Sequence, residues 1–152
     1  MYPGWVKACE RLLTRGYRSP VSAEQRPVEL ILARSLLATL STPGLLVDED
    51  GIVVFFNDAA SVLLGVRFEE IGRMGPEEWG TAFGPFDDSG NRVPFEELPL
   101  TIALRHGRPS HARFRIRSLK GVDSDIEAAA LPILTVGGTR GAMVFFWTKD
   151  DA

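Results

Sequence analysis

The chain has 152 residues, 45% hydrophobic and 24% charged, which are ordinary values for one globular domain with an extension. Its formal net charge of −3 gives no general attraction to nucleic acid or to anionic membranes. The single cysteine, Cys9, excludes an intramolecular disulfide framework and a multi-cysteine zinc site, and no apolar run approaches the roughly 18 residues of a membrane span.

Residues 1–27 are predicted to be an N-terminal extension. Trp5, Cys9, Leu12 and Leu13 have the spacing of one face of a short helix. The run that follows holds two prolines and several polar residues, which indicates a linker. The helix is either a docking arm for a partner or a cap on its own domain, and we favour the cap.

Residues 28–41 form the strongest predicted helix. Its main apolar stripe, which we expect to pack on the domain's own sheet, consists of Val28, Ile31, Leu32, Ser35, Leu36, Thr39 and Leu40. Leu30, Ala33 and Leu37 lie off that stripe, and an exposed apolar patch on a soluble protein usually marks an interaction surface. We therefore expect a homodimer whose interface contains these three residues. The alternative is that residues 1–15 fold back and cover them.

A hairpin and a short helix come next. Apolar runs at 45–47 and 52–56 flank an acidic turn that ends in Gly51, a residue that adopts the positive φ of such turns. Asn57 is expected to cap the helix that follows, and Gly65 to end it.

The segment from residue 66 to residue 99 is rich in glycine, proline and acidic residues. Short helices are predicted at 69–73 and 76–82. The acidic residues stand in adjacent pairs, whereas a calcium-binding loop has them at alternating positions. We interpret them as a solvated surface and predict no metal site.

A helix is predicted from Pro99 to His106, with three antiparallel strands after it. The strands are expected at 111–117, 125–134 and 141–147. The first alternates apolar and cationic residues, which is typical of a half-buried strand with a cationic outer face. The second has three alanines, 128–130, at its centre, and these small side chains leave room for close helix packing or for a ligand.

The hairpin and its helix resemble the opening of a PAS domain, a sensory and interaction module common in bacterial signalling. The resemblance lies in Leu-Val-Asp-x-Asp-Gly-x-Val-x-Phe-x-Asn-x-Ala-Ala-x-x-Leu-Leu-Gly. Further on, Pro-Glu-Glu-Trp and Glu-Glu-Leu-Pro-Leu resemble the middle of PAS domains attached to bacterial kinases and phosphatases. The resemblance covers roughly residues 28–148 and implies an α+β fold. This fold has a five-stranded antiparallel sheet with helices packed on one face, here with residues 1–27 as a helical extension and 149–152 as a tail.

The resemblance implies a cytoplasmic, bacterial signal-transduction module that binds a small apolar ligand, a protein partner or both, without catalysis. The partner would be a second copy, or a signalling kinase, phosphatase or regulator, and neither nucleic acid nor membrane. The ligand would lie between the helix at 99–106 and the sheet. With Leu45 as part of the same core, the expected cavity lining is Val47, Val54, Phe56, Leu100, Leu104, Phe114, Ala128, Ala130 and Val144.

Three alternatives accompany this prediction. Haem-binding PAS domains place a histidine on the helix that corresponds to 99–106, so His106 makes a haem-based gas or redox sensor the first alternative. A histidine in a last helical turn is more often a solvated cation, so we predict no cofactor. The second alternative is a dimerisation module without a ligand. The third is an enzyme on the same scaffold, although no catalytic motif is present. Flavin photochemistry of the light-sensing branch is excluded, because Cys9 lies outside the domain.

Overall fold

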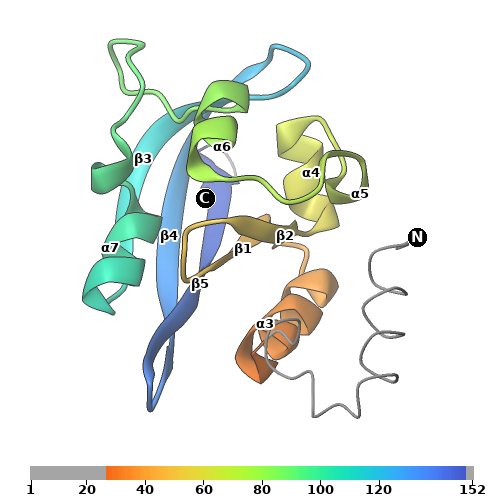
Figure 1. Ribbon diagram of the computed structural model, residues 1–152. Coiled ribbons are helices and arrows are strands. Elements are labelled where there is room, and N and C mark those ends of the chain that lie inside the picture. The colour runs from red at the N-terminus through yellow and green to blue at the C-terminus, as the bar shows by residue number, and fades with distance from the viewer. Residues whose placement is uncertain (1–26, 150–152) are drawn as a thin grey trace, which may run out of the picture.

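The computed structural model describes residues 27–149, in which one antiparallel sheet carries helices on both faces (Figure 1). Across the sheet, the five strands follow the order β2 (Val53–Phe56), β1 (Gly44–Asp48), β5 (Gly138–Thr148), β4 (Asp123–Thr135) and β3 (Ser110–Arg117). The helices are α3 (Val28–Thr39), α4 (Asp58–Leu64), α5 (Phe68–Ile71), α6 (Pro76–Ala82), the 3₁₀ helix η1 (Phe95–Glu97) and α7 (Pro99–His106). The predicted α+β class and five-stranded antiparallel sheet are confirmed.

Some expectations concern parts of the chain that the structure does not describe. The predicted helix with Trp5, Cys9, Leu12 and Leu13 lies outside the described residues, and so does the end of the tail, residues 150–152. Among residues 27–149, no helix is long and apolar enough to cross a membrane.

Each face of the sheet has its own apolar core. One core lies between the sheet and the helices α4, α6 and α7, and it includes Leu45 of β1 and Phe146 of β5. The other lies under α3 and includes Leu37 of that helix and Leu46 of β1. Leu45 and Leu46 belong to different cores because successive side chains of a strand point to opposite faces.

The side of α3 that faces the sheet is the reverse of the predicted one. Leu30, Ala33 and Leu37, predicted to form a dimer interface, are 5%, 7% and 0% exposed and pack against the sheet of their own chain. The stripe that was predicted to be buried lies on the outside, with exposed fractions between 50% and 64% for Val28, Ile31, Leu32 and Leu36.

Two glycines of the sheet explain this orientation of α3. A Cβ atom at Gly44 would lie 2.7 Å from Leu37 Cδ2, and one at Gly141 would lie 3.0 Å from Leu30 Cδ2. The two leucines therefore occupy space that the glycines leave open, and the small Ala33 between them permits a close approach. Both stripes have helical spacing, so periodicity alone does not distinguish them; the fit to the glycines does.

The first hairpin forms as predicted, with Asp48 organising its turn. Asp48 Oδ1 accepts hydrogen bonds from the backbone N–H groups of Asp50 at 2.9 Å and Ile52 at 3.1 Å. Gly51 has a φ of 82°, which only glycine adopts without strain. The turn thus depends on one acidic side chain and one glycine.

Asn57 is the predicted N-cap of α4, and its side chain also joins three segments. It is 2% exposed, and its Oδ1 accepts hydrogen bonds from the N–H groups of Ala60 at 3.0 Å and Gly44 at 3.1 Å. Its Nδ2 donates to the carbonyl oxygens of Leu37 at 3.0 Å and Thr42 at 2.9 Å. The end of α3, the start of β1 and the start of α4 are therefore held by one amide.

Aromatic side chains attach the segment between α4 and α7 to the sheet. Its helices α5 and α6 lie close to the predicted 69–73 and 76–82. The ring of Trp79 lies 6.4 Å from that of Phe56 and 4.6 Å from that of Phe83, between ring centroids. These contacts hold α6 over the sheet, where it helps to enclose a cavity.

The outward residues of β3 are cationic, as predicted, and acidic residues of β4 balance their charge. Three directly opposed pairs form ion pairs at 2.8, 3.0 and 2.7 Å: Arg113–Glu127, Arg115–Asp125 and Arg117–Asp123. The hydrogen bond from Arg117 holds the pKa of Asp123 below its ordinary value. The pKa of Glu127 is lowered first by Arg113 and then by Trp147, whose Nε1–H donates to it at 3.1 Å.

Short backbone bridges cover both outer strands of the sheet. Val53 of β2 exchanges hydrogen bonds with Met74, at 2.8 and 3.2 Å. On β3, Arg115 exchanges hydrogen bonds with Phe86, at 2.9 and 2.7 Å. The segment between α4 and α7 is therefore tied to the sheet by its backbone at both edges.

Candidate ligand-binding site

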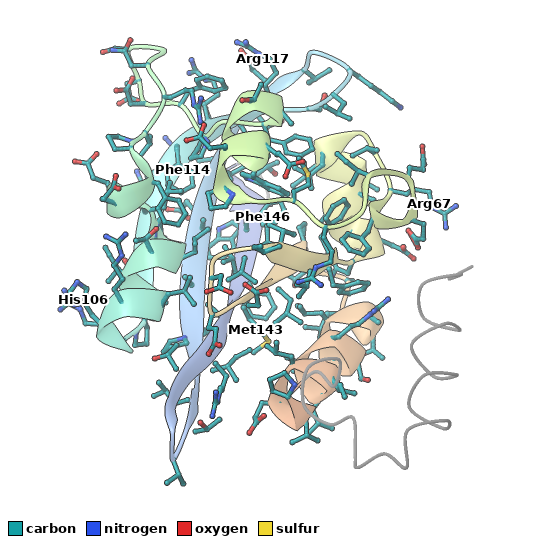
Figure 2. The ribbon with its side chains drawn as sticks, viewed as in Figure 1. Arg67, His106, Phe114, Arg117, Met143 and Phe146 are labelled. Carbon is teal, nitrogen blue, oxygen red and sulfur yellow. The ribbon has the colours of Figure 1, made fainter. Side chains whose placement is uncertain are left out.

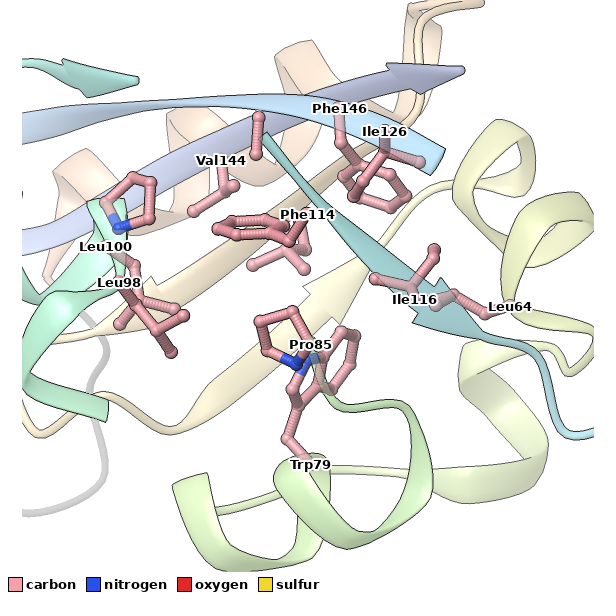
Figure 3. Close-up of a pocket in the computed structure, with 13 residues that line it drawn as sticks. Leu64, Trp79, Pro85, Leu98, Leu100, Phe114, Ile116, Ile126, Val144 and Phe146 are labelled. Atoms are coloured by element: carbon pink, nitrogen blue, oxygen red, sulfur yellow. The ribbon is translucent and has the colours of Figure 1, made fainter. Parts of the chain in front are cut away.

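An apolar cavity of about 50 Å³ lies between α6, α7 and the sheet (Figure 3). Trp79 of α6, Leu100 of α7 and Phe114 of β3 are among its walls. All 13 lining residues are apolar, and the indole N–H of Trp79 is their only polar side-chain group. Shape and burial of apolar surface are therefore what this cavity offers a ligand.

Small side chains create this space. On β4, Ile126, Ala128 and Ala130 face the helices, while the residues between them face the other side. Ala128 is 3% exposed and lines the cavity, where a larger residue would fill it. On α7, the fully buried Ala103 belongs to the same core, and its small side chain lets the helix pack closely on the sheet.

About half of the predicted lining residues surround the cavity. The structure places Leu100, Phe114, Ala128 and Val144 in its wall, together with Leu45. Four others belong to the same apolar core without lining the cavity: Val47, Phe56, Leu104 and Ala130. Contact between any of these residues and a ligand stays a prediction.

Val54 is the one predicted lining residue on the wrong face. The pairing of β1 with β2 shifts between Leu46 and Val47, so that Val53 pairs with Val47 and Val54 is the extra residue of a bulge. Its side chain joins the core under α3. Simple alternation along the strand therefore fails at this residue.

The prediction also missed eight lining residues. Ile116, Ile126 and Phe146 follow the inward alternation of their strands, which the sequence does display. The other five come from α4, from the segment before α7, whose path depends on tertiary contacts, and from the first residue of α7: Leu64, Trp79, Pro85, Leu98 and Pro99. No local pattern marks these five as lining residues of a cavity.

A second cavity of about 50 Å³ adjoins the first. The two share Leu45, Trp79, Leu98 and Leu100 as walls. The second is also mainly apolar, and its lining contains one charged residue, Arg92. The half-buried side chains of Trp79 and Leu100 thus lie between the first cavity, whose lining residues are all apolar, and the second cavity, whose wall contains Arg92.

His106 does not belong to either cavity. It lies exposed at the last turn of α7, at the outer end of that helix in Figure 2. No histidine lines the cavities, and 50 Å³ is far below the roughly 300 Å³ at which pockets for drug-sized ligands begin. The residues present therefore do not fit a haem bound through His106.

No protein-family model matches the chain, and no curated protein matches it. Its fold does match solved structures. The PAS domain of a protein from Colwellia psychrerythraea is 15% identical, with a TM-score of 0.57 over 81% of this chain and 98% of that chain. The PAS domain of the fruit-fly ELK potassium channel is 12% identical, with a TM-score of 0.62 over 79% of this chain and 96% of that chain.

A LOV protein from Rhodobacter sphaeroides is also similar, with 12% identity and a TM-score of 0.62 over 81% of this chain and 68% of that chain. At such low identities the similarity concerns the fold and not the function. Both the sequence pattern from Leu46 to Gly65 and the strand order β2-β1-β5-β4-β3 agree with it. The chain has the PAS fold.

Proposed function

We propose that the chain is a PAS-type sensory module that binds a small apolar ligand between α7 and the sheet and catalyses no reaction. The observation that supports this most is the cavity, whose 13 lining residues are all apolar. Burying an apolar group there releases it from water without leaving a polar group unpaired. The site provides binding energy and offers no nucleophile or base within its walls.

Ligand binding would act through the half-buried walls of the cavity. A space of about 50 Å³ holds only a few atoms, so a larger ligand must displace Trp79 or Leu100. A ligand changes a module of this kind only by binding one conformation better than another. Displacing one of these side chains would shift α6 or α7, to which it belongs. A partner such as a signalling kinase, phosphatase or regulator would bind the shifted and unshifted forms with different affinity.

Ala128→Leu tests this site by filling it. We expect the variant to fold and to lose the ligand, because the new side chain occupies the cavity. Ala130→Leu enters packed core at a fully buried position and should cost about 1–3 kcal/mol of the free energy of unfolding. Ala129→Leu lies on the opposite face and should change neither property. Mass spectrometry of extracted small molecules measures the amount of bound ligand, and thermal denaturation measures the stability. If Ala128→Leu retained as much ligand as the wild type, the ligand would bind elsewhere.

We further propose that α3 mediates self-association, through its outer face and not through the residues first predicted. Val28, Ile31, Leu32 and Leu36 are at least half exposed on this one helix. Apolar patches of this kind usually mark interaction sites, and two-fold pairing is the commonest way to cover one. The alternative is that residues 1–15 of the same chain cover this face of α3.

The double substitution Ile31→Glu with Leu36→Glu separates these two covers. Under self-association we expect a folded monomer in analytical ultracentrifugation, because both side chains are half exposed and their loss does not disturb the core. Val62→Glu, at an 82% exposed position of α4, is the control and should leave the mass unchanged. A wild-type protein that is monomeric at high micromolar concentration would contradict the proposal.

A further inference from the structure

Arg92 is held at the wall of the second cavity by its backbone and by α6. Its backbone forms a bridge with Phe86, and the next residue, Val93, donates its N–H to Pro85 O at 2.9 Å. Its guanidinium lies against Gly80 of α6, because a Cβ atom built at Gly80 would be only 1.8 Å from Arg92 Nη2. The absence of a side chain at residue 80 is therefore what lets the guanidinium reach this wall.

The charge of Arg92 has no counterion in the described part of the chain. No carboxylate of residues 27–149 lies within 4.0 Å of it, and no side-chain hydrogen bond of it is found there. Asp87, five residues before Arg92, is engaged in its own turn. Its carboxylate accepts the N–H groups of Ser89 and Asn91, at 2.9 Å each. By contrast, Arg113, Arg115 and Arg117 on β3 are all paired.

We propose that the ligand is a small amphipathic carboxylate, with its apolar body in the first cavity and its carboxylate on Arg92. The inference rests on the proposed function, since it specifies the ligand of the same site. The two cavities share Trp79, Leu98 and Leu100 as walls, so a ligand that displaces one of these side chains reaches from the first space to the guanidinium. A guanidinium binds a carboxylate through two parallel hydrogen bonds.

The single cation decides between classes of anion. Arg92 is the one charged residue in the lining of either cavity, so it neutralises one negative charge. A phosphate monoester carries between one and two negative charges at neutral pH, and the single guanidinium compensates only part of that charge. A cationic head group would be repelled. The site thus favours a monoanion, and the apolar walls favour a hydrocarbon body.

The test compares hexanoate, hexan-1-ol and hexyl phosphate as probes on the full chain, by NMR titration of the indole N–H groups. Of the two tryptophans at residues 27–149, Trp79 lines both cavities, whereas Trp147 lies on the other face of the sheet bonded to Glu127. The Trp79 signal should therefore shift and the Trp147 signal should not. We expect hexanoate to bind about tenfold more tightly than hexan-1-ol. This factor corresponds to the lower end of the free-energy range for a hydrogen bond to a charged group, which we choose because Arg92 is exposed. Hexyl phosphate should bind less tightly than hexanoate.

Two variants assign this preference to the guanidinium. Arg92→Gln removes the charge, and Gly80→Ala displaces the guanidinium by steric contact while adding a better helix former. Both should bring hexanoate down to the affinity of hexan-1-ol and leave hexan-1-ol binding unchanged. Arg92→Lys should restore part of the preference.

The outcomes separate this inference from the proposed function. Hexanoate and hexan-1-ol binding with equal affinity, or an unchanged preference in Arg92→Gln, overturns the carboxylate assignment and leaves the apolar site intact. Tighter binding of hexyl phosphate than of hexanoate also overturns it. If neither hexanoate nor hexan-1-ol shifts the Trp79 signal of the wild type, or if Ala128→Leu binds hexan-1-ol as the wild type does, the apolar site itself is wrong and the inference fails with it.

Discussion

Replacing Asn57 with alanine is expected to lower the free energy of unfolding by about 3–5 kcal/mol. The change removes the N-cap of α4 and leaves the carbonyl oxygen of Thr42 and the N–H of Gly44 without their partner. It also removes one of the two hydrogen bonds to the carbonyl oxygen of Leu37, which keeps the one from the N–H of Leu40. Asn57 is 2% exposed, so water does not replace these bonds without opening the structure. Urea denaturation followed by circular dichroism measures the loss.

Two further substitutions show where this energy comes from. Asn57→Ser keeps a side-chain oxygen for the cap but does not reach Leu37 or Thr42, so its effect should lie between those of the wild type and alanine. Asn91→Ala, at an exposed position, should stay within about 0.5 kcal/mol of the wild type. A loss below about 1 kcal/mol for Asn57→Ala would contradict the role of Asn57 as a junction.

Leu37→Ala is expected to cost about 2–5 kcal/mol, whereas Leu36→Ala should cost less than about 0.5 kcal/mol. The two residues are adjacent and chemically identical, but Leu37 is fully buried against Gly44 and Leu36 is 50% exposed. Urea denaturation of the two variants, at a protein concentration too low for self-association, therefore reports which side of α3 packs on the sheet. Equal losses, or a greater loss for Leu36→Ala, would mean that α3 faces the sheet with its other stripe.

Features that depend on a few neighbouring residues were predictable from the sequence. The turn at Asp48 and Gly51, the cap by Asn57 and the start of α7 at Pro99 follow from local backbone chemistry. The additional bonds from Asn57 to α3 were not predictable, because they join residues up to 20 positions apart.

Features that depend on the fit between distant segments were not predictable. Helical periodicity allowed two faces for α3, and only the match of Leu30 and Leu37 to glycines of the sheet distinguishes them. Strand alternation placed Val54 in the cavity, since a bulge leaves no mark in an apolar run. Arg92 showed no periodic or motif signal at all; the role that we propose for it rests on its contact with Gly80.

The backbone bridges at the two outer strands also bear on aggregation. An open strand edge offers unpaired N–H and C=O groups to any other chain. Here Met74 occupies part of the edge of β2, and Phe86 occupies part of the edge of β3, where Phe83 O also accepts the N–H of Arg117 at 3.0 Å. Arginines along β3 add charge to what is left of that edge. The sheet is thus poorly suited to growth by addition of strands, which agrees with our proposal that copies associate through the helical surface of α3 and not through strand edges.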